Sequence, residues 1–169
     1  MILLIGYATA MIAAGGDEGA VKGTGETVFR EPFTVKLQTD KEHFFEQKFV
    51  KMPFVHDGDV FLFRGDEFGL NLDIQGDAVR AVTYQPDLKR ADVTLKFSQE
   101  VRPDGGVMMM LAIHNGVKHK LLIDAMMSLP GKEGVVKTSI LPIEAGLADF
   151  ESWNDPIVVL VLRNIRLGK

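Results

Sequence analysis

The sequence predicts an all-β protein, a two-sheet antiparallel β-sandwich of the immunoglobulin-like or jelly-roll-like kind with about nine or ten strands and at most one short helix. Three observations predict this class. Apolar and polar residues alternate with the period of two that a half-buried strand requires. Gly, Pro, Asp and Asn interrupt the chain at the roughly 8–12-residue spacing of short antiparallel strands. The last run, residues 157–167, is apolar enough to lie in the middle of a sheet.

The first strand is expected over residues 33–38, where apolar and polar residues alternate. Residues 40–52 are ambiguous, because their aromatic residues fit a short helix that stops before Pro53 as well as a strand. The pair Asp57-Gly58 is expected to turn a hairpin. Further strands are expected, in order, over residues 54–56, 60–63, 70–74, 78–84 and 93–98.

The clearest hairpin pattern lies in residues 107–129, VMMMLAIHNGVKHKLLIDAMMSL, where Asn115-Gly116 joins two apolar runs. An Asn-Gly pair supplies the two positive-φ residues of a type I′ turn, so we expect two strands that pair with each other. Strands over residues 135–143 and 157–167 complete the fold. The final strand is expected at the centre of a sheet, because such an apolar edge would invite aggregation.

Composition excludes several classes of protein. The 169 residues fit one domain, and 46% hydrophobic with 25% charged residues is ordinary for a folded chain. A formal net charge of −4 with dispersed basic residues leaves no basic stripe for a phosphate backbone, so nucleic acid is not an expected partner. Cysteine is absent, and the chain shows no cofactor fingerprint, so no cofactor is expected.

The N-terminal residues predict export. Residues 1–14, MILLIGYATAMIAA, are apolar, too short to span a bilayer, and end in small residues that resemble a processing site. The basic residues that normally begin a secretory signal are missing, so a buried first strand or short helix is the alternative. We expect a signal peptide over residues 1–14, a Gly-rich linker over 15–27 and one β-sandwich domain over 28–169, without a membrane span in the mature chain.

The predicted hairpin suggests a metal site. A two-residue turn pairs Ala112 with His119 and so places His114 and His119 on one face, together with Met110. Imidazole and thioether ligands suit copper, which would make the protein a periplasmic copper handler. The alternative is that the methionines fill the core and both histidines are solvated.

A second candidate site lies between the last two predicted strands. Phe150 and Trp153 could stack on sugar rings while Glu151 and Asn154 bond hydroxyls, as in a carbohydrate-binding module. The alternative follows from the spacing of three that Leu147 shares with both aromatic residues. That spacing fits one helical turn whose apolar side plugs the end of the sandwich.

No catalytic residue is predicted, because no Ser sits in a nucleophile elbow and Cys is absent. A hydrolase with an unrecognised site would need a cleft lined by two carboxylates or by a His–carboxylate pair with perturbed pKa values. Asp124, inside an apolar strand, is expected on a solvated face with Lys118 and Lys120. The sequence therefore favours an exported, non-enzymatic binding or interaction module of the bacterial cell envelope, with a protein or glycan as partner.

Overall fold

The computed structural model describes residues 26–168, and within them the chain is almost entirely β. The strands are β1 (Phe33–Gln38), β2 (Phe44–Phe49), β3 (Val55–His56), β4 (Asp59–Leu62), β5 (Glu67–Gln75), β6 (Ala78–Gln85), β7 (Val93–Val101), β8 (Val107–Asn115), β9 (Leu121–Ser128), β10 (Val136–Ser139), β11 (Ala148–Trp153) and β12 (Val159–Leu167), and one 3₁₀ turn, η1 (Leu88–Arg90), precedes β7. The predicted signal segment 1–14 and most of the predicted linker lie outside the described residues.

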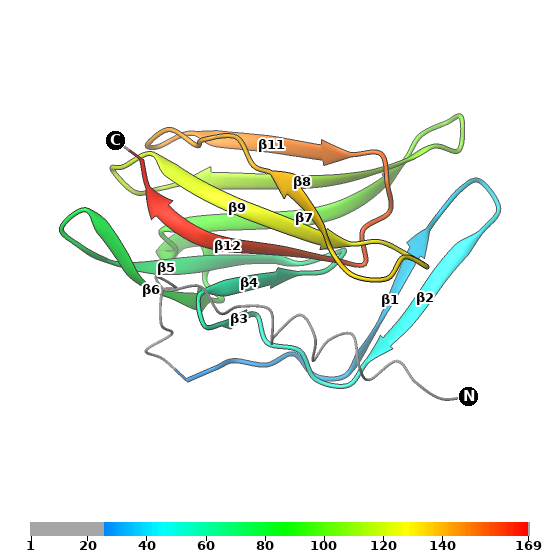
Figure 1. Ribbon diagram of the computed structural model, residues 1–169, viewed down its shortest axis with the longest axis horizontal. Helices are drawn as coiled ribbons and strands as arrows, with labels where there is room; N and C mark the ends of the chain where they lie inside the picture. Colours follow the sequence, from blue (N-terminus) through cyan, green and yellow to red (C-terminus); the bar gives the residue numbers. More distant parts are fainter. Residues whose placement is uncertain (1–25, 169) are drawn as a thin grey trace.

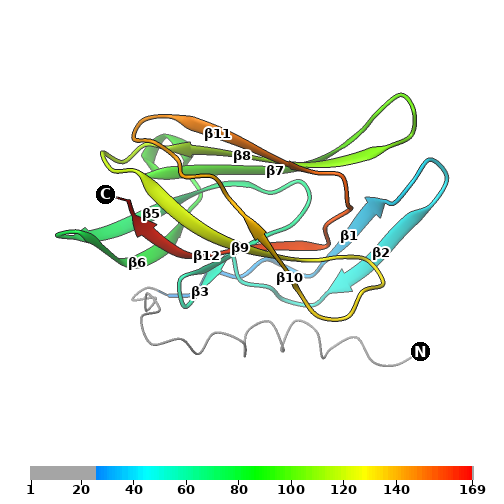
Figure 2. The same cartoon turned by 45° about the horizontal axis from the view of Figure 1, so that its top comes forward.

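Two five-stranded antiparallel sheets form the sandwich, which confirms the predicted fold class. Their strand orders are β10-β9-β12-β4-β3 and β11-β8-β7-β5-β6. Figures 1 and 2 show the two sheets as facing layers, with the separate β1–β2 hairpin standing at one end. The final strand β12 lies at the centre of its sheet, and residues 159–162 are buried on both faces, as the apolar run predicts.

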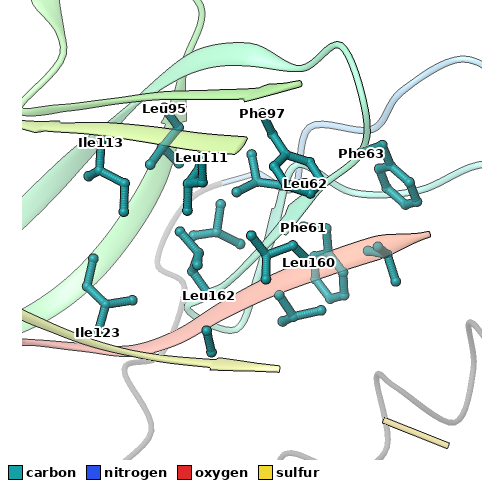
Figure 3. Packing of buried hydrophobic residues seen from close by; sticks show 14 of the residues in the cluster. Phe61, Leu62, Phe63, Leu95, Phe97, Leu111, Ile113, Ile123, Leu160 and Leu162 are labelled. Carbon is teal, nitrogen blue, oxygen red and sulfur yellow. The ribbon is translucent and has the colours of Figure 1, made fainter. Parts of the chain in front are cut away.

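Alternate residues of both sheets point inward and form one core. Leu95 of β7 and Leu111 and Ile113 of β8 face Ile123 of β9 and Leu162 of β12 (Figure 3), and each of the five is at most 5% exposed. Burying each of these side chains contributes about 1.5–3 kcal/mol, so the core holds the two sheets together.

The expected hairpin at Asn115-Gly116 is wrong, although both of its strands exist. β8 pairs with β7 and β11, whereas β9 pairs with β10 and β12, so the segment carries the chain from one sheet to the other. Neither residue adopts the positive φ of a type I′ turn. Instead the Asn115 side chain is fully buried, and its Nδ2 donates to the main-chain oxygens of His119 and Ile143.

The hairpin predicted at Asp57-Gly58 is confirmed. It joins β3 to β4, with His56 paired to Asp59. Asp57 and Gly58 have φ values of 48° and 81°, the backbone that a type I′ turn requires.

Two segments for which a helix was considered are strands. Within residues 40–52 the chain forms β2, and the predicted helical turn through Leu147, Phe150 and Trp153 is largely β11. The strand count reaches twelve because β2 and β11 join the predicted set. Nowhere in residues 26–168 is there a helix of the length and hydropathy needed to cross a bilayer.

Candidate functional site

A groove of about 710 Å³ lies on the outer face of the sheet that contains β12. It is lined by residues 122–126 of β9, by residues 137–140 and Pro142 on and after β10, and by Arg163, Asn164 and Arg166 of β12. The inward residues of β9 and β12 are apolar and pack in the core, so their outward residues, some charged and some apolar, line the groove. Its volume is within the roughly 300–1,000 Å³ of small-molecule sites.

A β-bulge in β12 gathers two arginines into this groove. Arg163 and Arg166 are three residues apart, so a regular strand would turn them to opposite faces. The pairing with β9 shifts between them, with Arg163 opposite Asp124 and Arg166 opposite Leu122. The extra residue therefore places both arginines outward while Ile165 stays buried. Asn164 makes the bulge with a φ of 49°, which Asn tolerates better than most residues.

The carboxylate of Asp124 is held by residues of the bulge. Asn164 Nδ2 donates to its Oδ2 at 3.0 Å, and Arg166 Nη1 donates to its Oδ1 at 2.9 Å. Partial burial raises the pKa of Asp124, but these two hydrogen bonds and the charges of Arg166 and Arg163 outweigh it and lower the pKa. Asp124 thus stays ionised, on the solvated face that was predicted, but with Arg166 rather than Lys118 or Lys120 as its cation.

Arg163 has no comparable partner. Its Nε lies 3.5 Å from Asp59 Oδ1, an ion pair without hydrogen-bond geometry, and the same Nε is buried without an acceptor. Its guanidinium makes no hydrogen bond to any other described residue. Burial raises the pKa of Asp59, although the positive charge of Arg163 opposes the shift. Arg163 is therefore a half-buried guanidinium whose donors remain available to a ligand.

The three residues of the predicted copper site do not converge. His114 is exposed on β8, while His119 is exposed in the connection to β9, so the register that put them on one face does not exist. Met110 shares the outer face of β8 with His114 but lies four residues away, roughly 13 Å along a strand. Among the described residues no three His, Cys, Asp or Glu side chains lie close enough to hold a metal ion. The copper site stays a prediction without geometric support.

The four residues of the predicted sugar site lie on β11 and just after it, but not on one surface. Phe150 pairs with Ala112 on the outer face and is 67% exposed. Trp153 faces inward, packs against the core and donates from Nε1 to Thr138 Oγ1 at 2.9 Å. Glu151 Oε1 accepts from the Leu141 amide, and Asn154 Oδ1 accepts from the Arg102 guanidinium.

The remaining His–carboxylate pairs lie in exposed turns. His43 Nδ1 is 2.8 Å from Asp40 Oδ1 at the tip of the β1–β2 hairpin, and His56 Nε2 is 3.4 Å from Asp57 Oδ2. Hydrogen bonds from the main-chain amides of Glu42 and His43 and from the His43 ring lower the pKa of Asp40. Both contacts stabilise the conformation of exposed turns, and neither pair is assigned a catalytic role.

Sequence reasoning missed Arg163 and Arg166. Their spacing of three, with Asn between them, would have been the pattern to notice, because Asn is among the residues that accept a left-handed backbone. The chain matches no family model, no curated protein and no solved structure.

Proposed function

We propose that this chain is a ligand-binding module without enzymatic activity and that the groove over β9, β10 and β12 is its ligand site. The observation that carries the proposal is Arg163, which lines the groove and, apart from the ion pair of its Nε with Asp59, makes no contact with an acceptor among the described residues. Arginine carries five N–H donors, so the donors of Arg163 other than Nε can serve an acceptor bound in the groove.

The chemistry of the lining supports binding rather than catalysis. Asp124 is the one carboxylate among the residues that line the groove, and both of its oxygens accept hydrogen bonds from neighbouring side chains. General acid–base chemistry needs a group free to exchange a proton near neutral pH, and the lowered pKa of Asp124 does not supply one.

The cellular location of the protein is a separate proposal, and it rests on the sequence alone. The apolar residues 1–14 favour an exported, periplasmic or extracellular module of the cell envelope. Copper handling and sugar binding rank below the groove, because their predicted residues do not converge.

The test is an NMR titration of the ¹⁵N-labelled full chain with hexanoate, hexanamide, hexyl phosphate, inorganic phosphate, glucose and triglycine. We expect at least one compound to shift amide resonances confined to residues 122–126, 137–142 and 163–166. Ser139→Trp, which fills the groove, should abolish the shifts, and Ser152→Trp, exposed on the other sheet, should not. The proposal fails if no compound shifts these resonances, or if binding survives Ser139→Trp.

A further inference from the structure

The groove holds more positive than negative charge once its internal bonds are counted. Lys137, Arg163 and Arg166 line it, against the single carboxylate of Asp124. Asp124 accepts a hydrogen bond from Arg166, whereas Lys137 and Arg163 make no hydrogen bond to a carboxylate in the lining. Lys137 forms no ion pair within the part of the chain that the structure describes.

Asp59, the second carboxylate near Arg163, accepts no hydrogen bond from the guanidinium. Asp59 comes from β4, on the side of β12 opposite to Asp124, and its Oδ1 lies 3.5 Å from Nε of Arg163. A guanidinium carries five N–H donors in a planar fork, so the Nη groups of Arg163 remain for an acceptor in the groove. Charge-assisted, two-pronged bonds from such a fork are best satisfied by a carboxylate or a phosphate.

Apolar side chains flank the charged centre on the same face. Leu122 and Met126 lie two residues to either side of Asp124 on β9, and both are partly exposed. Pro142 lines the groove beyond β10 and is exposed. A ligand whose charged end lies at Arg163 would therefore place its remaining atoms against apolar surface.

We infer that the groove takes an oxyanion, a carboxylate or phosphate joined to an apolar group, with the oxyanion bound by the guanidinium of Arg163. The β-bulge at Asn164 serves this site, because it turns Arg166 to the same face, where Arg166 donates to Asp124 while Arg163 makes no hydrogen bond to that carboxylate. This inference rests on the proposed function, since it names the ligand class of the same groove.

The same titration tests the ligand class through matched compounds and variants. Hexanoate and hexanamide differ in charge at nearly equal shape, and hexyl phosphate and inorganic phosphate differ in the apolar group. We expect hexanoate or hexyl phosphate to bind, and Arg163→Gln to weaken that binding by about tenfold or more, the loss of a charge-assisted hydrogen bond. Arg80→Gln, which changes an exposed arginine on β6 of the other sheet, should leave the affinity unchanged.

A second variant changes the competing anion instead of the arginine. Asp59→Asn removes the carboxylate behind Arg163, so binding should tighten, by roughly fivefold for a charge about 4 Å away in water. A spectrum that is unchanged away from the groove shows that each variant is folded.

The outcomes separate this inference from the proposed function. Equal affinity for hexanoate and hexanamide, equal affinity for inorganic and hexyl phosphate, or an Arg163→Gln variant that binds as well as the parent chain, would overturn the ligand class. If only glucose shifts the groove resonances, the binding module stands and the oxyanion does not. If only triglycine does, whose terminal carboxylate is an oxyanion without an apolar group, the binding module stands and the requirement for an apolar group does not. If none of the six compounds does, both fail.

Discussion

Arg30 forms a buried ion pair with Asp66, with Nη2 2.5 Å from Oδ2, and this pair fastens the segment before β1 to the sandwich. The side chains of the two residues are 7% and 17% exposed. Arg30 also donates to the main-chain oxygens of Pro53 at 2.6 Å and Phe61 at 2.7 Å. Its guanidinium lies 3.9 Å from the centre of the Phe54 ring. One residue thus connects the segment to β4 and to the loops on either side of the β3–β4 hairpin.

Removing Arg30 should be strongly destabilising. Arg30→Ala leaves Asp66 buried without its cation, and breaking a buried pair in this way costs about 3–5 kcal/mol. Urea unfolding measures the change in the free energy of unfolding. Arg80→Ala, at an exposed arginine of β6, is the control and should change it by less than about 0.5 kcal/mol. A loss below about 1 kcal/mol for Arg30→Ala would show that the ion pair does not hold the segment before β1 on the sandwich.

The segment that crosses from β8 to β9 should depend on the side-chain amide of Asn115. Asn115→Ala removes the donor that serves the main-chain oxygens of His119, Ile143 and Glu144. Leaving buried acceptors unbonded should lower the free energy of unfolding by at least about 2 kcal/mol. The exposed neighbour His114 provides the comparison, since His114→Ala should be nearly neutral. Equal effects of the two variants in thermal unfolding would contradict this role.

The same residue shows where sequence reasoning was sound and where it failed. β8 and β9 were predicted because the alternation of apolar and polar residues is a local property of each strand. The pairing of β8 and β9 was predicted wrongly, because Asn115-Gly116 does not turn a hairpin but lies where the chain crosses between the sheets. Gly116 approaches the Asp92 oxygen so closely that a Cβ would lie 2.9 Å from it, and Asn115 bonds residues from distant parts of the chain. Such contacts join residues far apart in the sequence, so a local pattern does not predict them.

The groove was missed for a related reason. In a regular strand with a period of two, one of Arg163 and Arg166 would face the core. The bulge between them lets both face outward. The alternative that placed Phe150 and Trp153 on one apolar surface was based on a spacing of three, which suits a helical turn. In the strand β11 the same spacing puts the two residues on opposite faces.

The bulge at Asn164 should tolerate Gly better than Val. A β-branched residue held at a φ of 49° is strained, at about 1–3 kcal/mol, whereas Gly adopts this backbone freely. Asn164→Gly loses only the exposed bond to Asp124, so Asn164→Val should have the lower melting temperature. The opposite order would mean that the left-handed backbone is not what the position requires.

Asp59 should make stability depend on pH. Burial raises its pKa in the folded protein, so the folded state holds the proton more tightly than the unfolded chain does. This stabilising contribution is complete below the ordinary Asp pKa of about 3.9 and is lost as pH rises through the raised value. The Asp59→Asn variant lacks this loss, so its stability relative to the parent chain should increase between pH 4 and neutral pH. Urea unfolding across that range measures it, and a constant difference would refute the assignment.

Trp153 should be structural, and Phe150 should not. Trp153 packs against the core and bonds Thr138 of β10, so it joins the edges of the two sheets. Trp153→Ala should therefore lower the free energy of unfolding by about 2–3 kcal/mol, somewhat less than for a fully buried Trp. Phe150→Ala, at a side chain that is 67% exposed, should change it by less than about 0.5 kcal/mol. Trp153→Phe keeps most of the packing and should lose about 1 kcal/mol with the hydrogen bond. If Trp153→Ala instead kept the melting temperature and abolished binding of a soluble glycan, β11 would be a sugar-binding surface and the residue would not be a tie between the sheets.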